Sequence, residues 1–234
     1  MAIAASPNPF KGVWHRHFIQ FDQDPPEATQ SVLWIQAQST FADVRSVPFT
    51  EPLTADRYRT LTWRQRFDVD LLGFAGHFTW HPVDETTGTS AWHHSLAITP
   101  RSRPDTSRYQ WIGSDDFVEH GTCEDDQGHS HNFLEHWHRV YDGPVTTWSL
   151  NPDLGQGLAL VAGPWAVLIY HQRQPHLEPW QDDFQSFSAT AWHQVAENWQ
   201  LQFGSLDPRV TVSAWTPDDL NADSPSGDWQ CHHQ

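Results

Sequence analysis

The sequence predicts an all-β protein, with a single antiparallel barrel over most of the chain and little helix. Short segments rich in aromatic and β-branched residues follow one another at regular intervals, and clusters of Asp, Gly and Pro separate them. Such spacing is typical of antiparallel barrels and sandwiches, because strand–helix–strand units need longer helical segments between their strands. Aromatic residues make up 13% of the chain and Trp occurs 14 times, which provides large rings for a core or for the walls of a cavity.

The predicted strands of the first part of the chain end at turn residues. A strand at 14–21 precedes Asp24, Pro25 and Pro26, and the last strand of this part precedes the Asp-Gly-Pro turn at 142–144. Asp, Gly and Pro favour tight turns and interrupt strand pairing. The full set of strands predicted for this part of the chain is 14–21, 32–38, 40–47, 61–69, 72–80, 91–98, 108–112, 117–123 and 133–140.

The strand pattern continues less regularly toward the C-terminus. Further strands are predicted at 146–150, 158–162, 165–171, 199–203 and 210–215. The segment 179–195 is the one candidate for a helix, with a loop or lid over a cavity mouth as the alternative. We expect residues 1–215 to form one β-barrel domain. We expect residues 216–234, rich in Asp, Pro and Ser, to form an acidic and mobile tail.

The charge of the chain excludes several classes of partner. The 29 acidic residues outnumber the 13 Lys and Arg residues, which gives a formal net charge of −16. An acidic surface repels phosphate backbones and anionic headgroups, so we expect neither nucleic acid nor a membrane as a partner. Two cysteines make no disulfide framework, and the first ten residues lack the features of a signal peptide, so we expect a cytoplasmic protein. Edge strands allow a homodimer without requiring one.

A succession of strand motifs runs through the middle of the chain. The motifs are Val-Leu-Trp-Ile-Gln at 32–36, Phe-Ala-Asp-Val-Arg at 41–45, Gly-Phe-Ala-Gly at 73–76, Trp-His-His at 92–94, Phe-Val-Glu at 117–119 and Leu-Glu-His-Trp at 134–137. With the Gly-Val-Trp triplet at 12–14, this succession resembles the lipocalin-like (calycin-type) barrels of a fungal two-barrel family and its bacterial relatives. The resemblance covers roughly residues 12–140. It implies an antiparallel calycin-type barrel, and it implies no activity, because none is settled for that family.

Residues two apart on a strand share a face, and this spacing predicts a polar pocket among the rings. If the Trp side chains point inward, Gln36, His94 and Glu135 point inward beside them. A few polar groups in a ring-lined cavity are typical of a small-molecule site. The predicted catalytic residues are His94, Glu135, Glu119 and Arg45, and the predicted ligand-binding residues are Trp34, Gln36, Phe74, Trp92 and Trp137. The alternative is a structural network of buried polar groups, in which Asp43 pairs with Arg45.

These residues favour a cofactor-free enzyme that acts on a small apolar or aromatic metabolite. Burial brings the pKa values of a Glu and a His toward neutrality, where Glu135 and His94 would serve as acid and base. Arg45 and Gln36 would stabilise a developing anion, in an isomerase, lyase, dehydratase or cyclase type of reaction. A carrier or sensor of a small hydrophobic ligand, without catalysis, is the first alternative.

A second constellation predicts a different protein. His129 and His131, followed by Glu135, have a spacing that resembles the first metal motif of cupins, in which imidazoles and a carboxylate hold one divalent metal ion. This alternative implies a cupin-like double-stranded β-helix and a metal-dependent oxygenase or isomerase. The second cupin motif is missing, and the segment 125–131 is also typical of a solvated hairpin tip.

Overall fold

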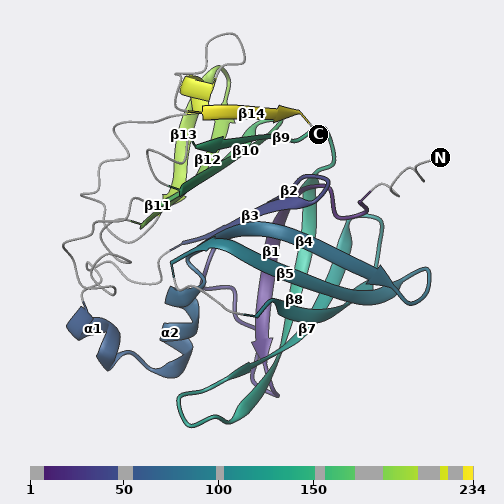
Figure 1. Ribbon diagram of the computed structural model, residues 1–234. Coiled ribbons are helices and arrows are strands. Elements are labelled where there is room, and N and C mark those ends of the chain that lie inside the picture. Colours follow the sequence, from purple (N-terminus) through teal and green to yellow (C-terminus); the bar gives the residue numbers. More distant parts are fainter. Residues whose placement is uncertain are drawn as a thin grey trace.

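Eight antiparallel strands close into a barrel, and a second sheet of six strands covers one side of it (Figure 1). The computed structural model describes residues 8–46, 55–98, 103–150, 156–171, 187–204, 217–220 and 229–233. Each barrel strand pairs with the next one along the chain, and β8 closes the barrel against β1. The barrel strands are β1 (Gly12–Phe21), β2 (Val32–Gln36), β3 (Thr40–Arg45), β4 (Gly73–Pro82), β5 (Thr87–Ala97), β6 (Asp105–Trp111), β7 (Asp116–Glu124) and β8 (Ser130–Tyr141).

This topology confirms the predicted all-β fold with a closed antiparallel barrel. The cupin-like alternative is wrong, because sequence neighbours pair in order around one closed barrel. A double-stranded β-helix instead pairs strands that are far apart in the sequence.

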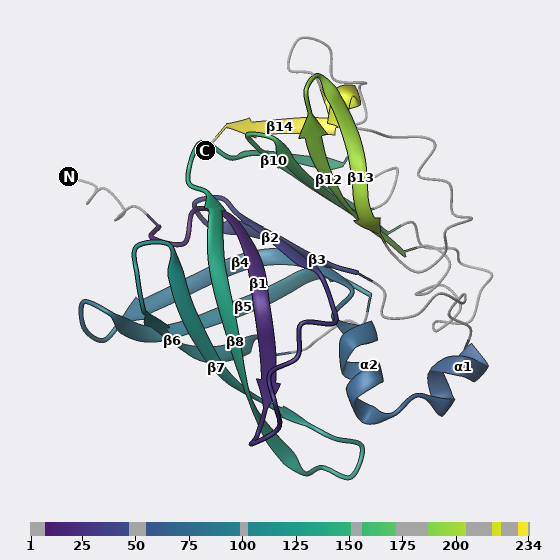
Figure 2. The same cartoon turned by 180° about the vertical axis from the view of Figure 1, so that it is seen from behind.

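The second sheet is built from the later strands, in the order β13-β12-β11-β10-β9-β14 (Figure 2). Its strands are β9 (Thr146–Leu150), β10 (Gln156–Ala162), β11 (Trp165–His171), β12 (Phe187–Val195), β13 (Asn198–Gly204) and β14 (Trp229–His233). Strand β14 lies in the stretch expected to be a mobile tail, and it pairs with β9 along its whole length. The short 3-10 helix Pro217–Leu220 precedes it. The strand predicted at 210–215 lies outside the described residues.

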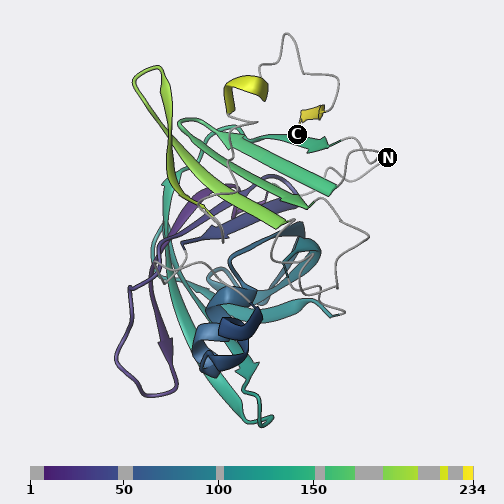
Figure 3. The same cartoon turned by 90° about the vertical axis from the view of Figure 1, so that its left-hand side faces the viewer.

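Two expectations about helices are wrong. The predicted strand at 61–69 is helix α2 (Trp63–Asp70), which follows helix α1 (Ala55–Thr60). Both helices lie beside the barrel on the side shown in Figure 3. A capping box starts α2: the Thr62 hydroxyl accepts from the Gln65 N–H at 3.3 Å, and the Gln65 side chain accepts from the Thr62 N–H at 2.9 Å. This Thr-x-x-Gln pattern outweighs the apparent alternation of the segment.

The described half of the predicted helix at 179–195 is also a strand, β12. It pairs with β11 from Phe187 to His193 and is buried over most of its length. A strand covered on both faces loses the alternation of buried and exposed residues that would reveal it in the sequence.

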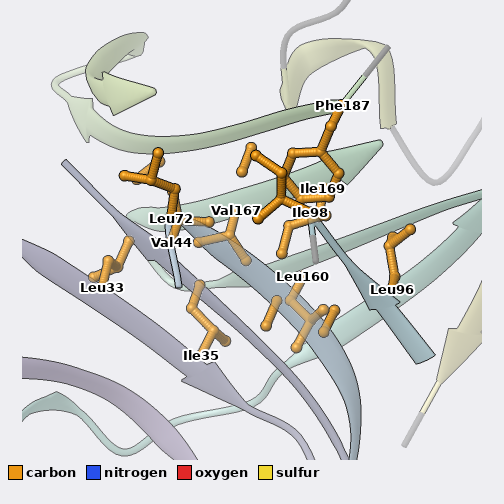
Figure 4. Close-up of a cluster of buried hydrophobic side chains, with 14 of the residues drawn as sticks. Leu33, Ile35, Val44, Leu72, Leu96, Ile98, Leu160, Val167, Ile169 and Phe187 are labelled. Carbon is orange, nitrogen blue, oxygen red and sulfur yellow. The ribbon is translucent and has the colours of Figure 1, made fainter. Parts of the chain in front are cut away.

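The largest apolar core lies between the barrel and the second sheet (Figure 4). Its barrel side is the outer face of β2, β3 and β5, and its other side is the inner face of β10, β11 and β12. The larger residues of this core include Leu33, Ile35, Val44, Leu96, Ile98, Leu160, Val167, Ile169 and Phe187. All five residues of β2 are therefore buried, because aromatic rings cover their inner face. Among the described helices, none has the length and apolarity to cross a membrane.

Candidate ligand site in the barrel

One part of the barrel interior is filled by aromatic rings. Trp14 and Trp34 stack with their centroids 5.5 Å apart, and Phe10 meets Phe78 edge-on at 5.2 Å. The Trp14 indole donates a 2.7 Å hydrogen bond to the Phe10 carbonyl oxygen. We call this ring cluster, formed by Phe10, Trp14, Trp34, Phe78 and Phe117, the aromatic plug.

Of the predicted ligand-binding residues, Trp34 belongs to the plug and Gln36 is hydrogen-bonded to it. The Gln36 amide oxygen accepts from Trp34 Nε1 at 3.3 Å, and its nitrogen donates to the carbonyl oxygens of Ala37 and Thr40 at 3.0 and 3.2 Å. Both side chains are fully buried. In the described part of the chain, neither residue belongs to the lining of the barrel cavity. Their hydrogen bonds hold the strands around the plug.

A cavity of about 640 Å³ extends from the rest of the barrel interior, past helix α2, to the β7–β8 hairpin. The structure brings the following predicted site residues to its lining: Arg45, Phe74, Trp92, Glu119, Glu135 and Trp137. Helix α2 adds Trp63, Arg66 and Phe67. Exposed lining residues, among them Arg103, Glu124 and Asp126, form the mouth of the cavity. Six of the nine residues singled out in the sequence therefore share this cavity, together with residues of α2 that the sequence pattern did not place there.

Arg45 belongs to the buried polar part of the cavity lining, which we call the cavity floor and which also contains Asp43, Glu119 and Glu135. Its Nε donates to Asp43 Oδ1 at 2.9 Å, and its Nη1 lies 3.5 Å from Glu135 Oε1. Burial alone would lower the pKa of Arg45, but Asp43 and Glu135 together raise it above its ordinary value. Burial raises the pKa of Asp43 in spite of the Arg45 charge. The Arg45 guanidinium also lies over the Phe74 ring, 5.5 Å from its centroid.

A second buried guanidinium, Arg16, binds the same Glu135 carboxylate. Arg16 Nη1 donates to Glu135 Oε1, and Nη2 donates to Gln30 Oε1 at 3.0 Å. Burial lowers the pKa of Arg16, and the Glu135 charge opposes that effect. Sequence reasoning missed this residue, although Trp14 and Arg16 have the same two-residue spacing as Trp34 and Gln36. Glu135 is thus a carboxylate shared by two cations.

Glu119 lies opposite Glu135 on the neighbouring strand β7. Its Oε1 accepts from Ser107 Oγ at 2.5 Å and from Trp92 Nε1 at 3.1 Å. Burial is the main cause that raises the pKa of Glu119 to about 7, and the negative charge of Glu135 adds to it. The hydrogen bonds from Ser107 and Trp92 partly offset these effects, because they lower the pKa of Glu119. A carboxyl group with this pKa exchanges a proton near neutral pH.

Two buried donor atoms of the lining residues, Arg45 Nη1 and Trp137 Nε1, make no hydrogen bond within the described chain. Arg45 Nη1 has only its 3.5 Å ion-pair contact with Glu135. The two residues are 4% and 1% exposed. An unmet buried donor costs about 1 to 3 kcal/mol, so a bound acceptor would stabilise both groups.

His94 does not join the cavity. Its ring stacks on Phe74 with the centroids 4.4 Å apart, and its Nε2 lies 3.2 Å from Asp105 Oδ2. A bulge between Ala75 and Gly76 shifts the pairing of β4 with β5 at this point. His94 is therefore buried behind Phe74, outside the described cavity lining, and Glu135 pairs with arginines instead.

The two histidines of the cupin-like motif meet at Asp125 and not at Glu135, whose carboxylate pairs with arginines. His131 Nδ1 lies 2.8 Å from Asp22, and its ring stacks on Trp63 at 4.3 Å. His129 Nδ1 lies 3.0 Å from Asp125 at the hairpin tip. Within the described ranges, no group of three or more His, Cys, Asp or Glu side chains is arranged to hold a metal ion.

The fold and the cavity define a closed antiparallel β-barrel protein with a second sheet packed on its outer face. A solved structure of an uncharacterized protein from Saccharomyces cerevisiae, YLR301w, has a similar fold, with a TM-score of 0.67. The match covers 95% of this chain and 98% of that chain, at 12% sequence identity. No family model matches the sequence, and no curated protein matches it.

Proposed function

We propose that the barrel binds a small organic molecule in the cavity beside Arg45, Glu119 and Glu135. The observation that carries this proposal is a cavity of about 640 Å³ whose lining includes buried charged groups and two buried N–H groups that make no hydrogen bond. A barrel that needed only stability would continue the aromatic plug, because filling the space with rings avoids the cost of burying charges. The volume lies in the range usual for ligand sites.

We also propose that the barrel belongs to the lipocalin-like class. The sequential antiparallel pairing of eight strands supports this assignment, as does the Gly-Val-Trp triplet that opens β1. Barrels of this size hold one small ligand between their strands. For this chain we propose a cytoplasmic location, which agrees with the absence of a disulfide between Cys123 and Cys231, both among the described residues.

A cofactor-free enzyme is the second candidate, and Glu119 favours it. Its pKa of about 7 suits a general acid or base at neutral pH. Glu119 therefore takes the role that the sequence had suggested for His94 and Glu135, while Arg45 would stabilise a developing anion. For the enzyme, Glu119→Gln is expected to abolish turnover and retain binding. For a carrier, neither the wild type nor Glu119→Gln forms any product.

The first experiment is native mass spectrometry of the untagged protein, with elemental analysis of the same sample. We expect a co-purified organic mass and less than about 0.2 equivalents of metal. Cys123 lines the outer part of the cavity, so Cys123→Trp should reduce the bound mass, whereas Cys123→Ala should retain it. A folded Cys123→Trp protein that carries the same organic mass as the Cys123→Ala control would contradict binding in this cavity. A divalent metal near one equivalent would contradict an organic ligand as the resident group.

A further inference from the structure

We propose that the ligand of the barrel is an aromatic monocarboxylic acid, whose carboxylate accepts hydrogen bonds from Arg45 and Trp137. This inference rests on the proposed function, since it names the chemistry of the molecule that the same cavity binds.

The two donors without hydrogen bonds belong to strands β3 and β8, which both line the cavity. Arg45 Nη1 is 3.5 Å from the carboxylate of Glu135. Glu135 and Trp137 are two residues apart on β8, so they share the inner face with their Cα atoms about 7 Å apart. Guanidinium and indole N–H groups only donate, so a partner of either group has to be an acceptor. A carboxylate has two acceptor oxygens, one for each donor.

Protonation of Glu119 limits the negative charge of the floor. Arg16 and Arg45 share the Glu135 carboxylate, and Arg45 also pairs with Asp43. Burial raises the pKa of Glu119 to about 7, so its carboxyl group is mostly neutral below that pH. The floor is therefore expected to hold the carboxylate of the ligand best below neutral pH.

The mouth of the cavity disfavours ligands with several negative charges. Its exposed and half-buried acidic groups include Asp105, Glu124 and Asp126, against Arg66 and Arg103. Arg66 is already paired with Asp126. The chain as a whole carries a formal charge of −16. This negative charge repels a phosphate ester, which carries about two negative charges, more strongly than a monocarboxylate, which carries one.

Aromatic walls suit a flat ring system attached to the carboxylate. Phe67 from α2 and Phe133 from β8 line the cavity with their centroids 6.1 Å apart. Phe74 and Trp92 line the opposite strands of the barrel. Rings of this kind pack against the faces and edges of other rings at centroid distances of 4.5 to 7 Å, which adds to the free energy of burial.

The test is a matched series of naphthalene probes titrated calorimetrically at pH 6. The probes are 2-naphthoic acid, 2-naphthamide and 2-(aminomethyl)naphthalene, which differ in charge and share one ring system. We expect the acid to bind at least about tenfold more tightly than the amide, the size of one hydrogen bond to a charged group. We expect the amine to bind most weakly.

Two Trp variants test whether the Trp137 indole N–H donates a hydrogen bond to the bound acid. Trp137→Phe removes one of these donors and should weaken binding of the acid about tenfold and binding of the amide by less, because a neutral carbonyl oxygen accepts a weaker hydrogen bond than a carboxylate. Trp148→Phe is the matched control, because Trp148 Nε1 is also buried without an acceptor in the described chain but belongs to the second sheet. It should leave all three affinities unchanged.

The pH dependence provides a second measurement that does not depend on these variants. Ionisation of Glu119 adds a negative charge beside Arg45, so binding of the acid should weaken as the pH rises through about 7. Glu119→Gln should remove the dependence near pH 7 and leave a smaller one near pH 6, because burial also raises the pKa of Asp68, which interacts with Arg16 and Arg45, to about 6.

The outcomes separate the two proposals. Amide binding as tight as acid binding, blocked by Cys123→Trp, would overturn the carboxylate assignment and leave the ligand cavity supported. Equal weakening of acid and amide by Trp137→Phe would also overturn the assignment. The absence of binding by all three probes, together with a protein that carries no organic mass, would overturn the proposed function itself.

Discussion

Replacing Glu119 by Gln should stabilise the protein at neutral and alkaline pH. The Glu119 carboxyl group is buried among Ser107, Trp92 and Glu135, and its pKa is raised from an ordinary 4.5 to about 7, chiefly by burial. The glutamine side chain is neutral at every pH. Its amide oxygen can accept the same two hydrogen bonds from Ser107 and Trp92 that the carboxyl group accepts. The substitution therefore removes the titration and retains the contacts.

The sign and the size of the effect follow from the two pKa values. Between pH 4.5 and about 7, the folded protein retains a proton at Glu119 that the unfolded chain has released. The free energy of unfolding of the wild type therefore falls as the pH rises through this interval, and this contribution is constant above it. At about 1.4 kcal/mol per pH unit, the loss reaches about 3 kcal/mol. Glu119→Gln should recover most of that amount at pH 8 and little of it at pH 5.

Urea unfolding of both proteins at pH values from 5 to 9 measures this difference directly. Glu85→Gln is the matched control, since Glu85 is exposed in the β4–β5 hairpin, and it should differ from the wild type by a small amount that does not vary with pH. A difference between Glu119→Gln and the wild type that stays constant from pH 5 to pH 9 would refute the reasoning. The carboxyl group would then titrate equally in the folded and unfolded chains.

Three further substitutions test other parts of the structure. Arg16→Met removes one of the two cations that bind Glu135, and urea unfolding should show a loss of about 3 kcal/mol, since the buried carboxylate is left underpaired; a loss below about 1 kcal/mol would contradict this role. Burial and nearby histidines lower the pKa of His15, so the unfolded chain binds this proton more readily, and stability is lost as the pH falls below 6.5. His15→Phe should reduce the fall in melting temperature between pH 8 and pH 5, and a curve parallel to that of the wild type would disprove it. Gly76→Ala would place a Cβ 1.9 Å from a carbonyl oxygen of β5 and should cost about 2 to 4 kcal/mol, whereas Gly113→Ala, with its nearest atom 3.7 Å away, should be nearly neutral in the same thermal melts.

The face of each barrel strand was predictable from the sequence, and the depth of a residue in the barrel was not. Trp34 and Gln36 point inward as the two-residue spacing predicts, and so do Glu135 and Trp137. In the first pair, however, Trp34 belongs to the aromatic plug and Gln36 is hydrogen-bonded to it, whereas the second pair lines the cavity. Alternation along a strand determines which side faces inward. The position along the barrel axis depends on the stagger between strands, which a single strand does not encode.

Sheet membership and helix α2 were harder to predict for different reasons. Most strands of the second sheet were recognisable as strands, but a strand pattern does not state which sheet the strand joins. Helix α2 was missed because apolar and polar residues alternate over much of 61–69, although Thr62 and Gln65 carried a capping-box signal. Without α2, sequence reasoning could not place Trp63 and Phe67 at the cavity.

The burial of β2 and β3 on both faces has a consequence for how the barrel moves. One half of its wall lies between the aromatic plug and the second sheet, so its amide hydrogens should exchange only when the whole protein unfolds. The half formed by β6, β7 and β8 has exposed residues along each strand, so its strands can separate locally without unfolding of the whole protein. Under the proposed function, a ligand wider than the resting mouth would enter through this second half. Its rate of entry would be set by local fluctuations of the β7–β8 hairpin, independently of the global stability of the fold.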